Sequence, residues 1–299
     1  MKLIAGFLVS MLGIFAITSC NSNSSSATNA DSTATTKDTV AASAGSTAGF
    51  KLGVQMWTFR MFSVTDALNK VDSAGIKHIE AFWGQKLGGD MKGEFGIKMS
   101  AGDKEKLKKL LQAKGIDIVA MGVISPGTKD EWVKAFELAK EFGLKYITAE
   151  PKKEFWDLID SLGGASGIKI AIHDHPKPNA YQHPDSVLAA IQGHKNIGAC
   201  ADIGHWARNG LDLVGCLKKL EGHIYGAHLK DIVKFDDPKA ADTVVSKGVI
   251  NIPAVLAEFK RQSFDGMFSI EHESNWYNNL PDVIFTREYF DAEVAKLNK

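Results

Sequence analysis

Eight short apolar segments, rich in β-branched residues, recur along the chain, and segments with helical periodicity separate them. The expected strands are residues 52–57, 78–82, 117–123, 146–150, 168–175, 197–202, 224–230 and 267–273. Strict alternation of strands and helices favours a parallel sheet, because parallel strands need long crossover connections. Eight such units in about 250 residues are typical of a single-domain (β/α)8 TIM barrel. The runner-up, an open doubly wound sheet, is disfavoured because no glycine-rich phosphate loop follows the first segment.

The first 20 residues have the pattern of an export signal rather than of a folded segment. Lys2 gives a short positive start, an apolar run follows, and small residues lead up to Cys20. That run is shorter than the roughly 20 residues that cross a bilayer. Residues 17–20 resemble a bacterial lipobox, whose cysteine becomes the lipid-bearing first residue. We therefore expect a lipoprotein on the periplasmic side, anchored to a membrane through Cys20; an ordinary signal peptide is the alternative.

Residues 21–49 consist mainly of Ser, Thr, Ala, Asn and Gly and contain no aromatic side chain. Such a segment buries too little apolar area to offset its ordering entropy. We expect it to be a disordered tether that leads to a folded part, residues 50–299. In that part Cys200 is expected to point into the barrel, whereas Cys216 lies on an outer helix, so we predict no disulfide between them.

The charge balance narrows the class of partner. Lys and Arg together number 35, and so do Asp and Glu, which gives a formal net charge of zero. A nucleic-acid-binding surface usually carries a marked basic excess, and this chain has none. We expect a small-molecule substrate and no nucleic-acid partner.

Acidic, imidazole and amine side chains gather at the ends of the last five expected strands. They are Glu150, His173, His175, Asp202, His205, His228, Lys230 and Glu271. In a TIM barrel the carboxyl ends of the strands form the catalytic face. Three carboxylates and an imidazole that converge there would need a cation to balance them. The sequence therefore predicts one divalent metal ion bound by Glu150, Asp202, His228 and Glu271. Three oxygens and one nitrogen favour Mn²⁺, with Mg²⁺, Co²⁺ and Zn²⁺ as alternatives.

The order and spacing of five segments resemble those of the xylose-isomerase-like barrels, also called sugar phosphate isomerases/epimerases. The segments are residues 147–150, 170–175, 202–205, 228–231 and 269–273. The resemblance implies the same four metal ligands, with Glu150 and Glu271 as acid/base groups on opposite sides of the substrate. It also implies that His173 and His205 contact substrate oxygens. The fifth strand departs from the family, because His173-Asp174-His175 stands where Glu or Asn is common.

Further substrate contacts are predicted from positions near the mouth of the barrel. We expect Lys230 to neutralise an oxyanion, although pairing with Asp202 or Glu271 is an equal alternative. The other candidates are His175, Trp57, Glu80 and Trp206. His175 would either contact the substrate or orient His173. The tryptophans would stack on a sugar ring or pack into the core.

Three functions remain open at this stage. The first is an isomerase or epimerase that acts through an enediolate, by removal of the proton α to a carbonyl. The second is a lyase or hydratase on 3-keto-glycosides that acts by β-elimination, and the third is a non-catalytic sugar-binding lipoprotein. Acidic residues follow the seventh strand, and amide and aromatic residues follow the eighth. These loops and the predicted export favour an unphosphorylated sugar.

Overall fold

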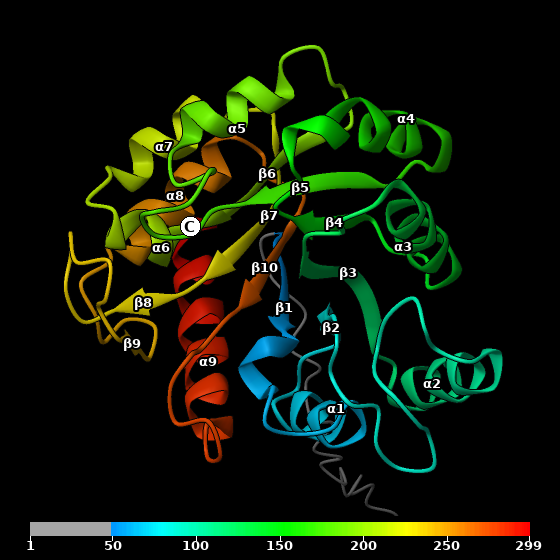
Figure 1. Cartoon of the computed structure of the whole chain (residues 1–299). Coiled ribbons are helices and arrows are strands. Elements are labelled where there is room, and N and C mark those ends of the chain that lie inside the picture. The colour runs from blue at the N-terminus through cyan, green and yellow to red at the C-terminus, as the bar shows by residue number, and fades with distance from the viewer. Residues whose placement is uncertain (1–48) are drawn as a thin grey trace, which may run out of the picture. The chain divides into compact units, whose positions relative to one another are not determined.

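A computed structural model describes residues 49–299, which form a closed barrel of eight parallel strands surrounded by helices (Figure 1). The strands are β1 (Lys51–Gln55), β2 (His78–Phe82), β3 (Asp117–Ile124), β4 (Tyr146–Ala149), β5 (Lys169–His173), β6 (Ile197–Asp202), β7 (Ile224–Leu229) and β10 (Met267–Ile270). They close in the order β1-β10-β7-β6-β5-β4-β3-β2. The predicted barrel is therefore confirmed. The predicted export signal, the lipid on Cys20 and nearly all of the tether lie outside the described residues.

The helices of the described part lie between the strands in sequence and around the barrel in space (Figure 1). They are α1 (Val64–Ser73), α2 (Ala101–Lys114), α3 (Lys129–Glu141), α4 (Trp156–Ser166), α5 (Pro184–Ile191), α6 (Ile203–Arg208), α7 (Leu213–Lys219), α8 (Ile252–Arg261) and α9 (Leu280–Leu297), with short 3-10 turns η1 (Met56–Phe59) and η2 (Lys153–Phe155). In residues 49–299 no helix is long and apolar enough to cross a membrane.

Local chemistry sets where the helices begin. At α3 the Thr128 side chain accepts a hydrogen bond from the Glu131 backbone N–H at 3.2 Å. The Glu131 carboxylate accepts one from the Thr128 backbone N–H at 3.1 Å. This reciprocal capping box satisfies donors that the first turn leaves free. Trp132 and Phe136 on the same helix are then buried against the barrel.

Two features beyond strand 6 were not expected from the sequence. Helix α6 starts directly after β6, because the Asp202 carboxylate caps it by accepting the His205 backbone N–H at 2.8 Å. After β7 the chain forms a small antiparallel pair, β8 (Asp231–Ile232) and β9 (Asp242–Thr243). Both features lie beside the carboxyl ends of the strands, so they add side chains to the mouth.

The barrel interior is closed by small and medium side chains below the mouth. Val119, Ala120, Tyr146, Ala171, Cys200 and Met267 form one buried cluster there. Cys200 and Cys216 are both buried and unpaired, which confirms the prediction of no disulfide. Gly226 on β7 leaves the space that Tyr146 fills: a Cβ on Gly226 would stand 2.6 Å from the tyrosine oxygen.

We predict that Gly226→Ala destabilises the barrel by about 1–3 kcal/mol, because the added methyl overpacks the interior against Tyr146. Urea unfolding measures the difference. Gly102→Ala is the matched control, because a Cβ on this exposed helical residue would come no closer than 3.9 Å to the nearest atom. It should leave stability unchanged or raise it by about 0.5–1 kcal/mol. Equal stability of Gly226→Ala and wild type would contradict the packing described here.

Candidate metal centre and active site

A cavity of about 340 Å³ opens at the carboxyl ends of the strands. Its lining combines imidazoles and carboxylates with an aromatic wall: Gln55, Trp57, Phe82, Val123, His173, His175, His205, Glu271 and Glu273. Trp57 and Phe82 meet edge to face with ring centroids 4.7 Å apart. All eight barrel strands are parallel, so their carboxyl ends bring residues that are far apart in sequence to this one place.

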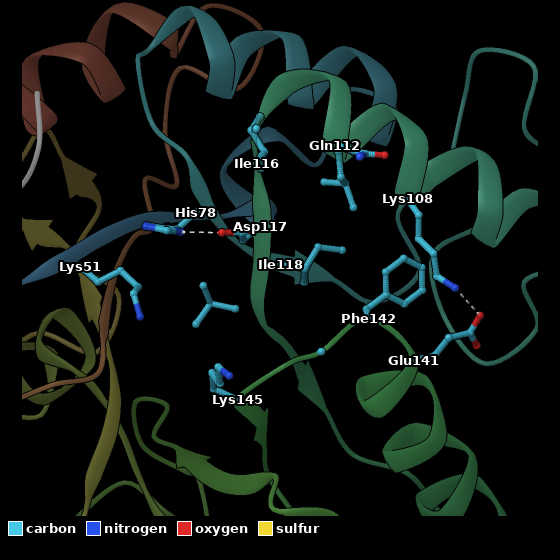
Figure 2. Close-up of a pocket in the computed structure, with 14 residues that line it drawn as sticks. Lys51, His78, Lys108, Gln112, Ile116, Asp117, Ile118, Glu141, Phe142 and Lys145 are labelled. Atoms are coloured by element: carbon cyan, nitrogen blue, oxygen red, sulfur yellow. Dashed lines mark hydrogen bonds and ion pairs between the residues drawn. The ribbon is translucent and has the colours of Figure 1, made fainter. Parts of the chain in front are cut away.

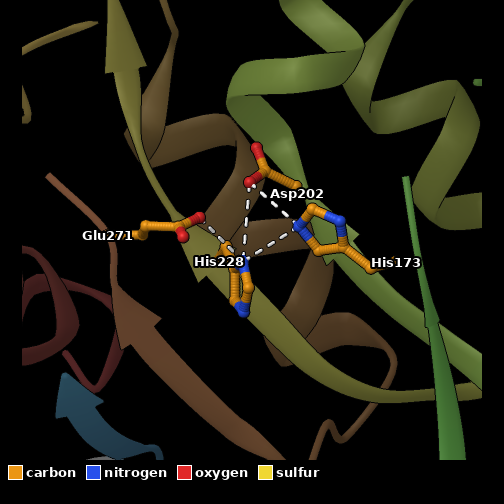
Figure 3. A group of neighbouring side chains, drawn as sticks. All are labelled: His173, Asp202, His228 and Glu271. Atoms are coloured by element: carbon orange, nitrogen blue, oxygen red, sulfur yellow. Dashed lines mark hydrogen bonds and ion pairs between the residues drawn. The ribbon is translucent and has the colours of Figure 1, made fainter. Parts of the chain in front are cut away.

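Four buried side chains form a compact cluster at the cavity (Figure 3). They are His173 at the end of β5, Asp202 at the end of β6, His228 on β7 and Glu271 just after β10. One ligand atom from each lies within 4.8 Å of the others. His228 Nδ1 is 2.9 Å from Glu271 Oε2 and 3.2 Å from His173 Nε2. Asp202 Oδ2 is 3.5 Å from both of those imidazole nitrogens.

The cluster fits a divalent cation. Asp202 Oδ2 and Glu271 Oε2 are buried, and no hydrogen bond of normal geometry reaches either oxygen. Two carboxylate oxygens and two imidazole nitrogens that face one another match the donor sets of Zn²⁺, Mn²⁺ and Co²⁺ better than the all-oxygen set that Mg²⁺ prefers. Buried carboxylates otherwise need a counter-charge. His173, Asp202, His228 and Glu271 are called the quartet below.

The quartet differs from the predicted ligand set at one position, because His173 stands where Glu150 was expected. Glu150 lies behind it: Oε1 is 3.5 Å from His173 Nδ1 and in direct contact with His175 Nδ1, and Oε2 accepts from Asn179 Nδ2 at 3.0 Å. Burial raises the pKa of Glu150, but hydrogen bonds from His173 and His175 outweigh it and hold that pKa well below its usual range. The ionised Glu150 carboxylate can accept a hydrogen bond from Nδ1–H of His173. His173 would then bind a metal ion through Nε2, which lies on the side of the cluster.

Glu80 plays the corresponding part for His228. Its side chain is fully buried, and Oε2 accepts from His228 Nε2 at 3.0 Å and from the Ser269 hydroxyl at 2.8 Å. The Nε2 proton is thereby fixed, so Nδ1 is the nitrogen through which His228 would bind a metal ion at the quartet. Glu80 is not among the residues that line the cavity, and its contact with a sugar stays a prediction.

Lys230 is a buried cation beside the quartet. Its ammonium nitrogen lies 3.0 Å from Glu271 Oε2, 3.3 Å from Asp202 Oδ2 and 3.3 Å from Glu273 Oε1. Burial lowers the pKa of Lys230, but Asp202 and the two glutamates outweigh it and raise that pKa well above its usual range. Of the two predicted roles, pairing with the carboxylates is the one that the structure contains.

The remaining predicted contacts divide into two groups. Trp57, His175 and His205 line the cavity, as predicted. Trp206 does not, because α6 turns its side chain into the hydrophobic core, where it is 1% exposed. This placement is the core-packing alternative of the two roles predicted for the tryptophans.

Three residues outside the predicted site set lie at or beside the cavity, and of these only Glu273 stands in a segment, residues 269–273, that resembles the family. Glu273 lines the cavity, and the Arg208 guanidinium and the Asp242 carboxylate form a buried ion pair beside it. These two residues are 34 positions apart, and only the β8–β9 excursion brings them together. Outside the lining, Arg60 stacks on both Trp57 and Trp276, with its guanidinium carbon 4.2 and 3.7 Å from the ring centroids.

A larger cavity, of about 630 Å³, lies at the opposite end of the barrel beside α2 and α3 (Figure 2). Lys51, Lys145 and the 3.9 Å pair of His78 with Asp117 line it. Among the described residues, both groups with the composition and spacing of a metal site lie instead at the carboxyl ends of the strands. The smaller cavity is therefore the candidate active site.

The comparisons with known proteins agree with this fold. A model of the xylose isomerase-like TIM barrel family matches residues 68–290. The chain therefore belongs to that family. A structure of an uncharacterised protein from Parabacteroides distasonis is 33% identical, with a TM-score of 0.67 over 81% of this chain and 98% of that one.

More distant relatives share the fold at lower identity. A D-tagatose 3-epimerase-like protein is 20% identical, with a TM-score of 0.66 over 83% of this chain and 98% of its own. The IOLI protein, solved with a zinc atom, is 17% identical, with a TM-score of 0.68 over 83% and 99%. An uncharacterised protein from Methanocaldococcus jannaschii is 28% identical over 139 residues, 44% of this chain and 45% of that protein. The chain thus spans about half the length of this curated relative.

We predict that His173→Ala removes high-affinity metal binding, whereas Glu150→Gln weakens it by at most about 10–100-fold. The first change deletes a ligand, and the second only alters the group that orients that ligand. Chelator competition with Zn²⁺ or Mn²⁺ on the purified chain measures both affinities. The opposite ranking, with Glu150→Gln the more damaging, would restore Glu150 as the fourth ligand.

Glu80→Gln should lower metal affinity about 10-fold or more, because it removes the charge that fixes the His228 tautomer. Glu154→Gln, on the exposed η2 turn, is the matched control and should leave the affinity unchanged. The same chelator competition reports both variants. Unchanged affinity in Glu80→Gln would mean that the buried carboxylate does not act through His228.

Proposed function

We propose that the chain is a divalent-metal-dependent isomerase or epimerase that acts on an unphosphorylated sugar by removing the proton α to a carbonyl. The observation that carries this proposal is the buried quartet at a cavity with an aromatic wall. A divalent ion held there would polarise a carbonyl and its neighbouring hydroxyl as a Lewis acid. The donor set of the quartet suits Mn²⁺, Co²⁺ or Zn²⁺.

Glu271 is the proposed proton acceptor. It lines the cavity, and its pKa is lowered to about 2, because Lys230 and His228 outweigh the burial that would raise it. The carboxylate is therefore ionised at neutral pH. When the α C–H bond breaks, the proton goes to Glu271 and the electron pair forms the enediolate of the substrate. Return of the proton to the neighbouring carbon, with the hydroxyl proton passing to the former carbonyl oxygen, gives an isomer. Protonation of the same carbon on the opposite face, by a donor such as His175 in the lining, gives an epimer.

Lys230 and Lys247 are two lysines that could meet a phosphate group, and their surroundings support an unphosphorylated substrate. Lys230 is held by three carboxylates, and Lys247 lies over the Phe285 ring at 4.8 Å from its centroid. Backbone N–H groups of the chain after β7 donate to a side chain of the protein itself. Asp231 accepts from Ile232, Ser246, Gly248 and Ile250 at 2.9–3.1 Å. Backbone amides of this kind are what a phosphate site needs.

Export also favours this class of substrate. We propose, from the pattern of residues 1–49, that the protein is a lipoprotein anchored through Cys20 on the periplasmic side of a membrane. Sugar phosphates made in the cytoplasm are scarce there. The aromatic wall of Trp57 and Phe82 is suited to the apolar face of a sugar ring.

A second candidate is β-elimination from a 3-keto-glycoside, and the placement of Glu150 favours it. Epimerisation by two carboxylates needs one on each side of the substrate. Here Glu271 and Glu273 line the cavity from one strand end, whereas His173 and His175 line it from β5, with Glu150 behind them. One base with an imidazole acid opposite suits loss of a leaving group.

Exchange of the α-proton with heavy water tests the proposal on a panel of ketoses, aldoses and 3-keto-glycosides. We expect Glu271→Gln to slow exchange about 10²–10⁴-fold, with metal occupancy measured alongside, and the exposed Glu154→Gln to have no effect. An isomer or epimer as product supports the first candidate, and a released aglycone supports the second. No exchange by the metal-loaded enzyme on any of these substrates would overturn both.

The same assay on matched free and phosphorylated sugars tests the substrate class. We expect the free sugar to have the higher kcat/KM. A preference of more than about tenfold for the phosphorylated sugar, roughly 1.4 kcal/mol, would contradict the account of the two lysines and of the loop after β7.

A further inference from the structure

Helix α6 places two side chains in line with the cavity. Asp202 caps its N-terminus, and His205 and Arg208 stand three residues apart on one face of the helix. Both are buried, at 4% and 6% exposure, yet His205 reaches the cavity lining. The ring of His205 thus has one nitrogen toward Arg208 and the other toward the site.

The Arg208 guanidinium is fixed on three sides. Its Nε donates to the Ala240 carbonyl at 3.0 Å, and Nη2 contacts Asp242 Oδ1 in a buried ion pair. Asp242 is itself held, because Oδ2 accepts the Glu273 backbone N–H at 3.1 Å. The remaining arm of the guanidinium, Nη1, lies 2.8 Å from His205 Nδ1. Arg208 therefore cannot turn away from His205 without giving up buried partners.

This contact determines where the imidazole proton sits. A guanidinium has only donors, so Nη1 donates and Nδ1 of His205 must accept with its lone pair. The ring proton of His205 is then on Nε2. On that side lie Asp202 Oδ2 at 3.6 Å and the Lys230 ammonium at 3.5 Å. The ammonium also has only donors, so it could bond to Nε2 only in the other tautomer. The Arg208 contact at 2.8 Å is much shorter than the Lys230 contact at 3.5 Å, so the contact with Arg208 decides the tautomer.

A base at His205 would need a free lone pair, and neither nitrogen has one. Nδ1 is occupied by Arg208, and Nε2 carries the proton. A second ring proton would also place an imidazolium between the cations of Arg208 and Lys230. The geometry leaves His205 one role at the cavity, which is to donate Nε2–H to an oxygen.

We propose that Arg208 is a positioning residue that locks His205 in the neutral tautomer with its proton on Nε2, so that His205 serves as a hydrogen-bond donor to a substrate oxygen and not as a base. The inferred tautomer of His205 depends only on the contacts of Arg208. Only the identity of the acceptor, an oxygen of the sugar, rests on the proposed function.

Nitrogen NMR of the zinc-loaded chain, labelled with ¹⁵N in the histidine rings, tests the tautomer without any substrate. His205→Gln identifies the resonances of His205. We expect a protonated Nε2 and a bare, hydrogen-bonded Nδ1 at neutral pH. A proton on Nδ1 in the wild-type spectrum would overturn the proposal at once.

Arg208→Met tests the cause. Without the guanidinium, its two other partners, the Asp242 carboxylate and the Ala240 carbonyl, remain, and both can only accept a hydrogen bond. We therefore expect the ring proton to move to Nδ1 and kcat to fall about 10²-fold. Arg208→Lys, which keeps a donor, should retain the Nε2 proton and recover part of kcat. If Arg208→Met fails to fold, Arg208→Lys still tests whether a donor at this position holds the proton on Nε2. Arg287→Met, at a surface pair with Glu288, is the matched control and should change neither.

The two readouts separate this inference from the proposed function. If no sugar is turned over but the tautomer follows Arg208 as expected, the proposed function fails and the positioning role stands. If turnover is found but Arg208→Met keeps both the Nε2 proton and full kcat, the positioning role is overturned and the proposed function survives.

Discussion

Asp202 Oδ2 and Glu271 Oε2 are two carboxylate oxygens buried at the mouth of the barrel, and the groups around them have to balance their negative charge. No hydrogen bond satisfies either oxygen, and both face the imidazole nitrogens of His173 and His228. Lys230 supplies one buried positive charge, and the quartet has the donor set for a second. Removing these oxygens would leave Lys230 a buried cation with Glu273 as its nearest remaining carboxylate.

Each of the three histidines discussed here, His173, His205 and His228, has a charged hydrogen-bonding partner that orients its ring. Glu80 accepts from His228 and Glu150 lies against His173, so both histidines would bind a metal ion at the quartet through the other ring nitrogen. Arg208 donates to His205, so that histidine presents a proton instead. The same side chain thus has opposite hydrogen-bonding roles within one cavity, and the sign of the partner's charge decides which.

The sequence predicts the barrel well because its information is local and periodic. All eight strands are found, with ends that shift by a few residues, and Asp202, His228 and Glu271 do converge at the mouth. The place of His173 in the quartet, with Glu150 in a second group with His173 and His175, depends on where β4 and β5 end and on how far each side chain reaches, which periodicity does not encode.

The second layer of the site was harder to anticipate from sequence. Glu80 meets His228 across 148 positions, and Arg208 meets Asp242 across 34. No spacing rule connects such pairs, because only closure of the barrel and the β8–β9 excursion make them neighbours. The position of Trp206 differs from the predicted mouth position for a local reason. The sequence does not indicate helix α6, and the first turn of this helix directs the Trp206 ring into the core.

The central claim is that two imidazoles and two carboxylates hold the metal. X-ray absorption spectroscopy of the zinc-loaded chain tests it most directly, because the outer-shell scattering of imidazole rings counts the histidine ligands. We expect two imidazoles per zinc, falling to one in His173→Gln and staying at two in Glu150→Gln. A single imidazole in the wild-type protein, unaffected by His173→Gln, would contradict it.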